Sequence, residues 1–167
     1  MGSAITVRPA ASGDVGHILE MIRSLAEYEH LADQCVIQAE ALREHLFGHD
    51  PAAEVLIAQI DSSAAGFALF FTTYSTFLGK PGLWLEDLFV FDEHRGNGLG
   101  RALLRRLAQT AIARGYGRLE WSVLDANRSA IAFYQSLGAD LMDDWTTCRV
   151  TGEHLATLAR HTSVYRT

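Results

Sequence analysis

The sequence predicts an α+β fold in which helices flank a central mixed, mostly antiparallel sheet. Short apolar or alternating segments, typical of strands, are interleaved with segments whose apolar residues recur at helical spacing. The chain has 167 residues, of which 49% are hydrophobic, and it contains no repeat or low-complexity linker. This length and composition favour one compact core, so we expect a single domain over residues 1–167.

The first half of the chain begins with an expected strand over residues 5–8. Ser12 or Asp14 is then suited to cap a helix. The apolar positions of that helix recur every three or four residues: Val15, Ile18, Leu19, Ile22, Leu25 and Ala26. A second, short helix is expected over residues 39–47. It ends at Gly48, a residue suited to the left-handed position that closes many helices.

The central part of the chain predicts three strands. Residues 55–60 and 67–73 flank a connection typical of a hairpin, and residues 83–90 form an apolar run that leads into a glycine-rich segment. The remaining expected elements are a helix over 101–114, a strand over 119–123, a helix over 129–137 that ends at Gly138, a strand over 146–150 and a helix over 153–159.

The charge balance indicates the class of partner. With 14 Lys and Arg against 20 Asp and Glu, the net charge is −6, which does not favour binding to nucleic acid and suits a cationic small molecule such as an amine. The two cysteines, Cys35 and Cys148, stand far apart and form no CxxC motif, as expected for reduced thiols. No apolar run approaches the roughly 20 residues that span a bilayer. We therefore expect a cytoplasmic protein with no nucleic-acid or membrane partner.

The sequence predicts no metal site. His45 and His49 have the spacing of a helical metal pair, but the segment lacks the glutamate of the H-E-x-x-H motif and Gly48 interrupts it.

The most informative motif is the glycine-rich segment Arg95-Gly96-Asn97-Gly98-Leu99-Gly100, which lies between an expected strand and an expected helix. Glycines let the backbone adopt positive φ and approach a ligand closely, and the free N–H groups at the start of a helix favour a phosphate. The spacing fits neither the dinucleotide fingerprint nor the P-loop of nucleotide triphosphatases. It predicts a different phosphate ligand.

The Arg-x-x-Gly-x-Gly pattern resembles the signature of the GNAT N-acetyltransferase superfamily. The segments 85–90 and 127–139 resemble two further segments of that superfamily, in the same order. The opening of the chain, residues 5–10 and 24–29, is similar to the polyamine (diamine) acetyltransferase branch. The resemblance implies a sheet splayed between its fourth and fifth strands, acetyl-CoA as the co-substrate bound between those strands, and a homodimer.

The resemblance assigns the cofactor site to three segments. The backbone of residues 96–101 would hold the pyrophosphate, with positive charge from arginine side chains, and the strand end would pair with the pantetheine arm. The N–H of Val90 would polarise the acetyl carbonyl. The expected cofactor-binding residues are Leu88, Phe89, Val90, Arg95, Gly96, Asn97, Gly98, Leu99, Gly100, Arg101, Asn127, Ser129 and Ala130.

Two side chains are the expected catalytic residues. Glu86 lies in an otherwise apolar strand, where burial would suit its carboxyl group to act as a base or an amine anchor. The regular alternation of a strand would turn Asp87 to the opposite face, which makes it the weaker candidate. Tyr134 is the expected general acid, because a phenol is protonated at neutral pH and can donate to a departing thiolate.

The expected amine-binding residues are Tyr28, Glu29, Glu86 and Asp144. Carboxylates and an aromatic face suit an elongated cation. Asp144 belongs, with Asp143, to a paired acidic element that resembles one in the polyamine branch. Thr76 stands where that branch has an acidic residue, so the sequence leaves the identity of the amine open.

These observations predict an acetyl-CoA-dependent N-acetyltransferase that acts on a primary amine of a small cationic substrate, a polyamine or a related amine, by direct attack in a ternary complex. Two alternatives stay open: an acetyltransferase for protein lysines or N-termini, and a non-catalytic sensor of acetyl-CoA.

Overall fold

The computed structural model of the chain describes residues 4–160. They fall into two compact units that divide after Ser122, and each unit is described by itself. The single domain over residues 1–167 stays a prediction. The first unit contains β1 (Ile5–Pro9), α1 (Val15–Tyr28), α2 (Ala39–Phe47), β2 (Glu54–Ile60), β3 (Ser63–Ser75), β4 (Lys80–Val90), α3 (Leu99–Ala113) and β5 (Leu119–Trp121). The second unit contains α4 (Arg128–Gln135) and α5 (Gly152–Arg160).

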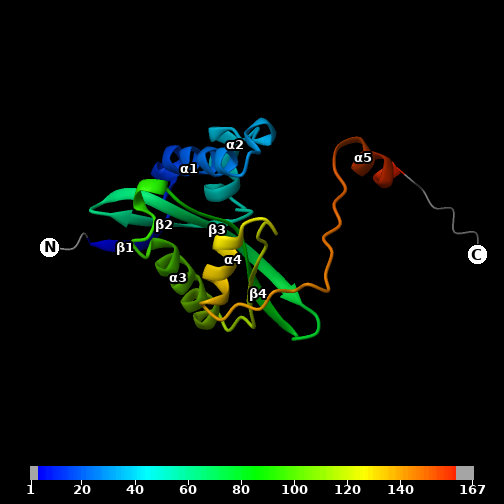
Figure 1. Cartoon of the computed structure of the whole chain (residues 1–167). Helices are drawn as coiled ribbons and strands as arrows, with labels where there is room; N and C mark the ends of the chain where they lie inside the picture. The colour runs from blue at the N-terminus through cyan, green and yellow to red at the C-terminus, as the bar shows by residue number, and fades with distance from the viewer. Residues whose placement is uncertain (1–3, 161–167) are drawn as a thin grey trace, which may run out of the picture. The chain divides into compact units, whose positions relative to one another are not determined.

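The strands of the first unit form one sheet in the order β1-β2-β3-β4-β5 (Figure 1). Neighbouring strands are antiparallel from β1 to β4, whereas β4 and β5 are parallel. The parallel pair needs a crossover, and α3 provides it. The mixed, mostly antiparallel sheet expected from the sequence is therefore confirmed.

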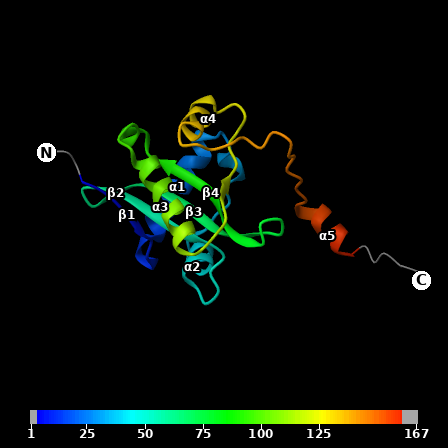
Figure 2. The same cartoon turned by 90° about the horizontal axis from the view of Figure 1, so that it is seen from below.

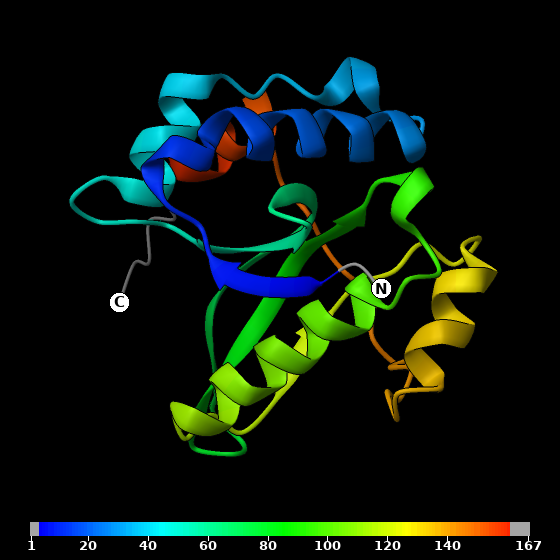
Figure 3. The same ribbon diagram turned by 90° about the vertical axis from the view of Figure 1, so that its left-hand side faces the viewer.

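Helices cover both faces of this sheet. Figures 1 and 3 show α1 and α2 on one face and α3 on the other. On the α1 face, a core cluster joins residues from both helices to inward side chains of β2, β3 and β4, and Phe67 and Phe89 pack there with ring centroids 6.5 Å apart. On the other face, α3 lies across the strands (Figure 2) and buries residues at helical spacing: Leu99, Leu103, Leu104, Leu107 and Ala111.

The start of α1 is fixed by an ion pair. Asp14 precedes the helix, and its carboxylate accepts from both Nη atoms of Arg8 at 2.8 Å and from the backbone N–H of Ala11 at 2.7 Å. The hydrogen bonds from Arg8 lower the pKa of Asp14 to about 2. The pair ties β1 to the start of α1, which runs to Tyr28.

Strand β4 contains a bulge. Leu69 of β3 pairs with Asp87, but its neighbour Phe70 pairs with Leu85, so Glu86 is an extra residue in β4. Cross-strand partners share a face, and Leu69 and Phe70 face opposite ways. Asp87 and Leu85 therefore lie on opposite faces although they are two residues apart.

Strand β5 is short. It pairs with β4 over three residue pairs, and the last pair joins Trp121 to Leu85. Strand β4 continues to Val90. Beyond Leu85, none of the described strands pairs with the β5-side edge of β4, which is the splayed arrangement implied by the resemblance.

Two local expectations are wrong. Residues 146–150 form no strand in the structure. Gly48 ends α2 with an extended backbone, φ −73° and ψ −167°, instead of a left-handed one. A Cβ atom at Gly48 would collide with the backbone and side chain of Glu44, so space and not positive φ favours glycine here.

Within residues 4–160, none of the helices is long and apolar enough to cross a bilayer.

Candidate active site

The glycine-rich segment forms the turn that the sequence predicts. Gly96 and Gly98 have φ of 78° and 85°, and Gly98 directly precedes α3. These values lie in the left-handed region, which side chains with a Cβ atom rarely adopt. Gly98 has no side chain to cap the helix, and Asn97 beside it is exposed. The N–H groups at the start of α3 thus form a positive end that fits a phosphate.

The end of β4 offers hydrogen-bonding groups on its open side. The N–H of Phe91 donates to Ala65 of the β3 side at 3.1 Å. Because backbone groups alternate in direction along a strand, the N–H groups of Leu88 and Val90 point the other way, to the edge that β5 has left. An extended ligand arm can pair with this edge as another strand would.

Arg95 does not project freely from the glycine segment. Its Nε donates to the carbonyl of Val90 at 3.1 Å, and its Nη2 lies 2.9 Å from a carboxylate oxygen of Asp92. Its guanidinium also lies over the ring of Tyr28, 4.4 Å from the centroid. Arg95 therefore links β4, the turn after it and the end of α1.

The expectation of a buried Glu86 is wrong. Glu86 is exposed, and its Oε2 accepts a hydrogen bond of 2.8 Å from the indole Nε1 of Trp84. The bulge explains the difference, since Glu86 is the residue that the register leaves out. The carboxyl group that the sheet turns inward is that of Asp87.

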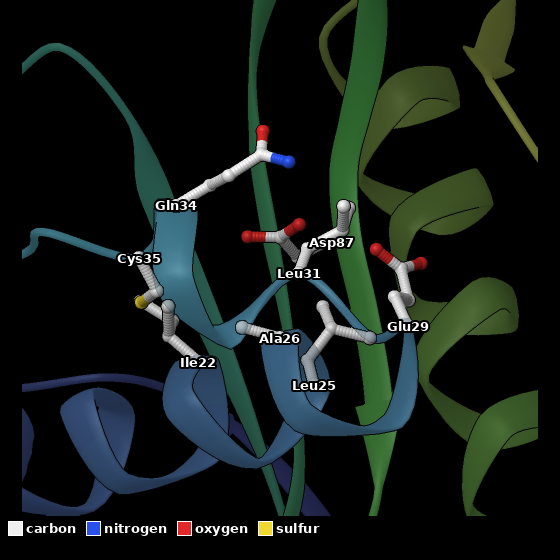
Figure 4. A pocket seen from close by; sticks show the side chains of 8 residues that line it. All are labelled: Ile22, Leu25, Ala26, Glu29, Leu31, Gln34, Cys35 and Asp87. Atoms are coloured by element: carbon white, nitrogen blue, oxygen red, sulfur yellow. The ribbon is translucent and has the colours of Figure 1, made fainter.

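Asp87 lines an open pocket of about 200 Å³ against α1 (Figure 4). Strand β4 contributes Asp87, and α1 with the segment after it contributes the other lining residues. These are Ile22, Leu25, Ala26, Glu29, Leu31, Gln34 and Cys35. The pocket combines an aliphatic wall with two carboxylates, which suits the alkyl chain and the charged end of an aliphatic amine.

The surroundings of Asp87 alter its protonation. Burial of the carboxyl group, followed by the negative charges of Glu86 and Glu29, raises the pKa of Asp87 to about 6. The carboxylates of Glu86 and Glu29 thus both lie close enough to Asp87 to disfavour its negative charge. A cation bound among them would relieve that repulsion.

The first unit therefore brings together Tyr28, Glu29, Glu86, the open end of β4 and the glycine segment. The sequence ranked Asp87 below Glu86 because the bulge could not be seen. It missed Gln34 and Cys35 because they lie in and just after a 3-10 turn (Ala32–Gln34), where no periodic pattern marks a side chain that faces a pocket.

The second unit contains the other expected site residues. The Oδ1 of Asn127 accepts from the N–H of Ala130 at 3.2 Å and from the hydroxyl of Ser129 at 3.1 Å, so Asn127 caps α4. Tyr134 lies one turn further along α4, and its ring packs against Phe133 with centroids 5.4 Å apart. Asp144 is exposed in the segment after the helix.

The comparison with known proteins decides the family. Residues 19–139 match the family model described as "Acetyltransferase (GNAT) family". The chain belongs to the GNAT acetyltransferase family. The matched residues include the open end of β4, the glycine segment and Tyr134, and acetyltransferases of this family use acetyl-CoA as the co-substrate.

Individual relatives agree with this assignment. The chain is 39% identical to the thialysine N-epsilon-acetyltransferase of Sus scrofa over 94% of this chain and 98% of that protein. It is 33% identical to the spermidine/spermine N(1)-acetyltransferase-like protein 1 of Homo sapiens over 92% of this chain and 23% of that protein. Among solved structures, an integron cassette protein of V. cholerae has a TM-score of 0.80 with 25% identity, over 95% of this chain and 99% of that chain.

Within residues 4–160, no group of three or more His, Cys, Asp or Glu side chains is arranged to hold a metal ion.

The raised pKa of Asp87 predicts that its carboxylate costs stability at neutral pH. The carboxyl group is protonated in both the folded and the unfolded chain at pH 3. It ionises near pH 4 when unfolded and only near pH 6 when folded, so the penalty grows between these values and is complete above pH 6. We expect Asp87→Asn to raise the free energy of unfolding at pH 7 by about 3 kcal/mol, and the gain to shrink below pH 6 and vanish near pH 3. Urea unfolding at several pH values measures this.

Asp50→Asn is the control, because Asp50 is exposed; we expect this variant to leave the pH profile unchanged. A loss of stability in Asp87→Asn at pH 7 would mean that the carboxylate is held by a structural partner.

Proposed function

We propose that the protein transfers the acetyl group of acetyl-CoA to a primary amine of a small aliphatic cation, either a polyamine or an ω-amino compound of the thialysine type. The observation that carries the proposal is the pocket of Asp87 and Glu29, in which carboxylates are set into an aliphatic wall. The net charge of −6 favours the approach of such a cation. The names of the two relatives support both substrate types.

The residues of the amine pocket hold the ammonium group and take up its proton. Asp87 is ionised above about pH 6 and faces the aliphatic wall, so it anchors the amine and accepts a proton from it. Glu86, exposed beside it, adds negative charge. Tyr28 and Glu29 bound the other side at the end of α1, and Asp144 is proposed as a further amine contact.

The open end of β4 and the glycine segment hold the co-substrate, which supplies an activated thioester. Residues 96–101 bind the pyrophosphate through backbone N–H groups, with Arg101 adding charge. The backbone at Leu88, Phe89 and Val90 pairs with the pantetheine arm, and the N–H of Val90 donates to the thioester carbonyl as negative charge develops there. Asn127, Ser129 and Ala130 contribute contacts from the start of α4.

The transfer proceeds by direct attack. The neutral amine forms a bond to the carbonyl carbon, the carbon–sulfur bond breaks, and Tyr134 gives its phenolic proton to the departing thiolate. The proton lost by the amine leaves through Asp87. No cysteine nucleophile is required. Within the described residues Cys148 is exposed, and Cys35 lines the amine pocket.

A homodimer and a cytoplasmic location stay predictions from the sequence. So do the two other functions, acetylation of protein lysines or N-termini and non-catalytic sensing of acetyl-CoA.

The test of the proposal is release of coenzyme A from acetyl-CoA in the presence of spermidine, spermine, putrescine, thialysine, lysine, simple amines and lysine peptides. We expect turnover on one or more of the free aliphatic amines and little on peptides, because a pocket of about 200 Å³ accepts a slender chain. Turnover on peptides alone would favour the protein acetyltransferase. Tight coenzyme A binding without turnover would favour the sensor.

The role of Tyr134 predicts a selective loss of kcat. We expect Tyr134→Phe to lower kcat by about a hundredfold or more, the usual contribution of a positioned acid, while the KM of the amine changes less than about threefold. Initial rates with the best amine of the panel measure both constants. Tyr74→Phe, at an exposed tyrosine of β3, is the control and is expected to behave as the unchanged protein. An unchanged kcat in Tyr134→Phe would exclude Tyr134 as the general acid.

A further inference from the structure

Arg95 makes more contacts with the protein than a side chain that only binds a phosphate would need. Its guanidinium contacts three parts of the chain at once: the carbonyl of Val90, the carboxylate of Asp92 and the ring of Tyr28. The pairing with Asp92 offsets its charge, and the hydrogen bond to Val90 uses its Nε. Much of the bonding capacity of Arg95 is therefore directed to the protein itself.

The contact with Tyr28 connects the two halves of the site. Tyr28 is the last residue of α1, and the next residue, Glu29, lines the amine pocket. On the other side, Val90 ends the open edge of β4, and Arg95 begins the glycine segment. A guanidinium stacked on a tyrosine ring is a directed contact, because cation and ring must lie face to face.

The last turn of α1 packs on the core through Leu25, whereas Tyr28 is 44% exposed. The hydrogen bonds that close the helix are backbone bonds, from Glu29 to Leu25 at 2.9 Å, from His30 to Glu27 at 3.1 Å and from Leu31 to Ala26 at 2.8 Å. Helix ends of this kind open readily unless a side chain holds them. Arg95, which follows β4, provides such a side chain through its contact with Tyr28.

We propose that Arg95 is a positioning residue that fixes the last turn of α1 against the end of β4, and so sets the place of Glu29 in the amine pocket. The inference rests on the proposed function only where it concerns the amine. Arg95 determines amine affinity through Tyr28, whereas the backbone of the glycine segment determines affinity for the co-substrate.

The first test is hydrogen exchange in the unliganded protein, which needs no substrate. In Arg95→Lys, we expect the amides of residues 29–31 to exchange about three- to tenfold faster, because lysine keeps the charge but loses the planar stack and the Nε donor. In Tyr28→Leu, we expect the amide of Arg95, which donates to the carbonyl of Asp92 at 3.1 Å, to exchange faster by a similar factor. The effect of each substitution is thus measured by amide exchange in the segment that the substitution does not alter.

The second test is steady-state kinetics with the best amine of the panel. Arg95→Lys and Tyr28→Leu are each expected to raise the KM of the amine roughly three- to tenfold, with the KM of acetyl-CoA changed less than about twofold. The double variant should be no worse than the poorer single variant, since both remove the same contact.

Two controls accompany these variants. Tyr28→Phe keeps the aromatic ring, so we expect residues 29–31 and the amide of Arg95 to exchange as they do in the unaltered protein. Arg114→Lys alters an arginine of the same kind, paired with Glu54 and with its guanidinium 6.0 Å from the ring centroid of Tyr116, outside the amine pocket. We expect Arg114→Lys to leave the amine KM unchanged.

Unchanged exchange of residues 29–31 in Arg95→Lys would overturn the proposal. So would a raised KM for acetyl-CoA with an unchanged amine KM, which would make Arg95 a phosphate ligand alone. If the unaltered protein turns over no amine, the proposed function fails, and the exchange rates still decide the positioning role.

Discussion

The hydrogen-bonded pairing of β4 is the constraint on which the site depends. From Leu83 to Leu85, the strand is paired on both sides, with β3 and with β5. After Leu85, the register with β3 shifts and the pairing with β5 stops. Backbone donors that a sheet would normally use are thereby left for a ligand, at the point where the chain turns into the glycine segment. An unpaired strand edge can pair with other chains and promote aggregation. Its position next to the glycine segment therefore favours a role in ligand binding.

The bulge at Glu86 also determines which carboxyl group lies on the face of the sheet that α1 covers. It turns Asp87 towards α1, where burial and two neighbouring carboxylates raise its pKa to about 6. In the proposed function, a single extra residue thus separates two roles of one strand. The edge of β4 would bind the co-substrate, and its α1 face would bind the amine. Arg95 then joins these two regions through Val90 and Tyr28.

The sequence predicted much of this structure, because local patterns determine much of it. Residues 39–47 form α2 as expected, and the glycine segment precedes a helix because Gly98 adopts positive φ. The sequence could not predict that Asp87 faces inward and Glu86 does not. That outcome depends on the register between β3 and β4, and two adjacent acidic residues give no sign of which is the extra one. The expected strand over 146–150 failed because β-propensity does not provide a partner strand. The contact between Arg95 and Tyr28 joins residues far apart in the chain, and no spacing in the sequence predicts it.

The most direct test of the account is residue-resolved amide exchange of the protein with and without coenzyme A. We expect coenzyme A to protect the amides of Leu88 and Val90 and those of residues 96–101, while Phe91, already bonded to Ala65, changes little. Protection at the glycine segment without any at Leu88 and Val90 would contradict the claim that the open edge of β4 binds the arm of the co-substrate.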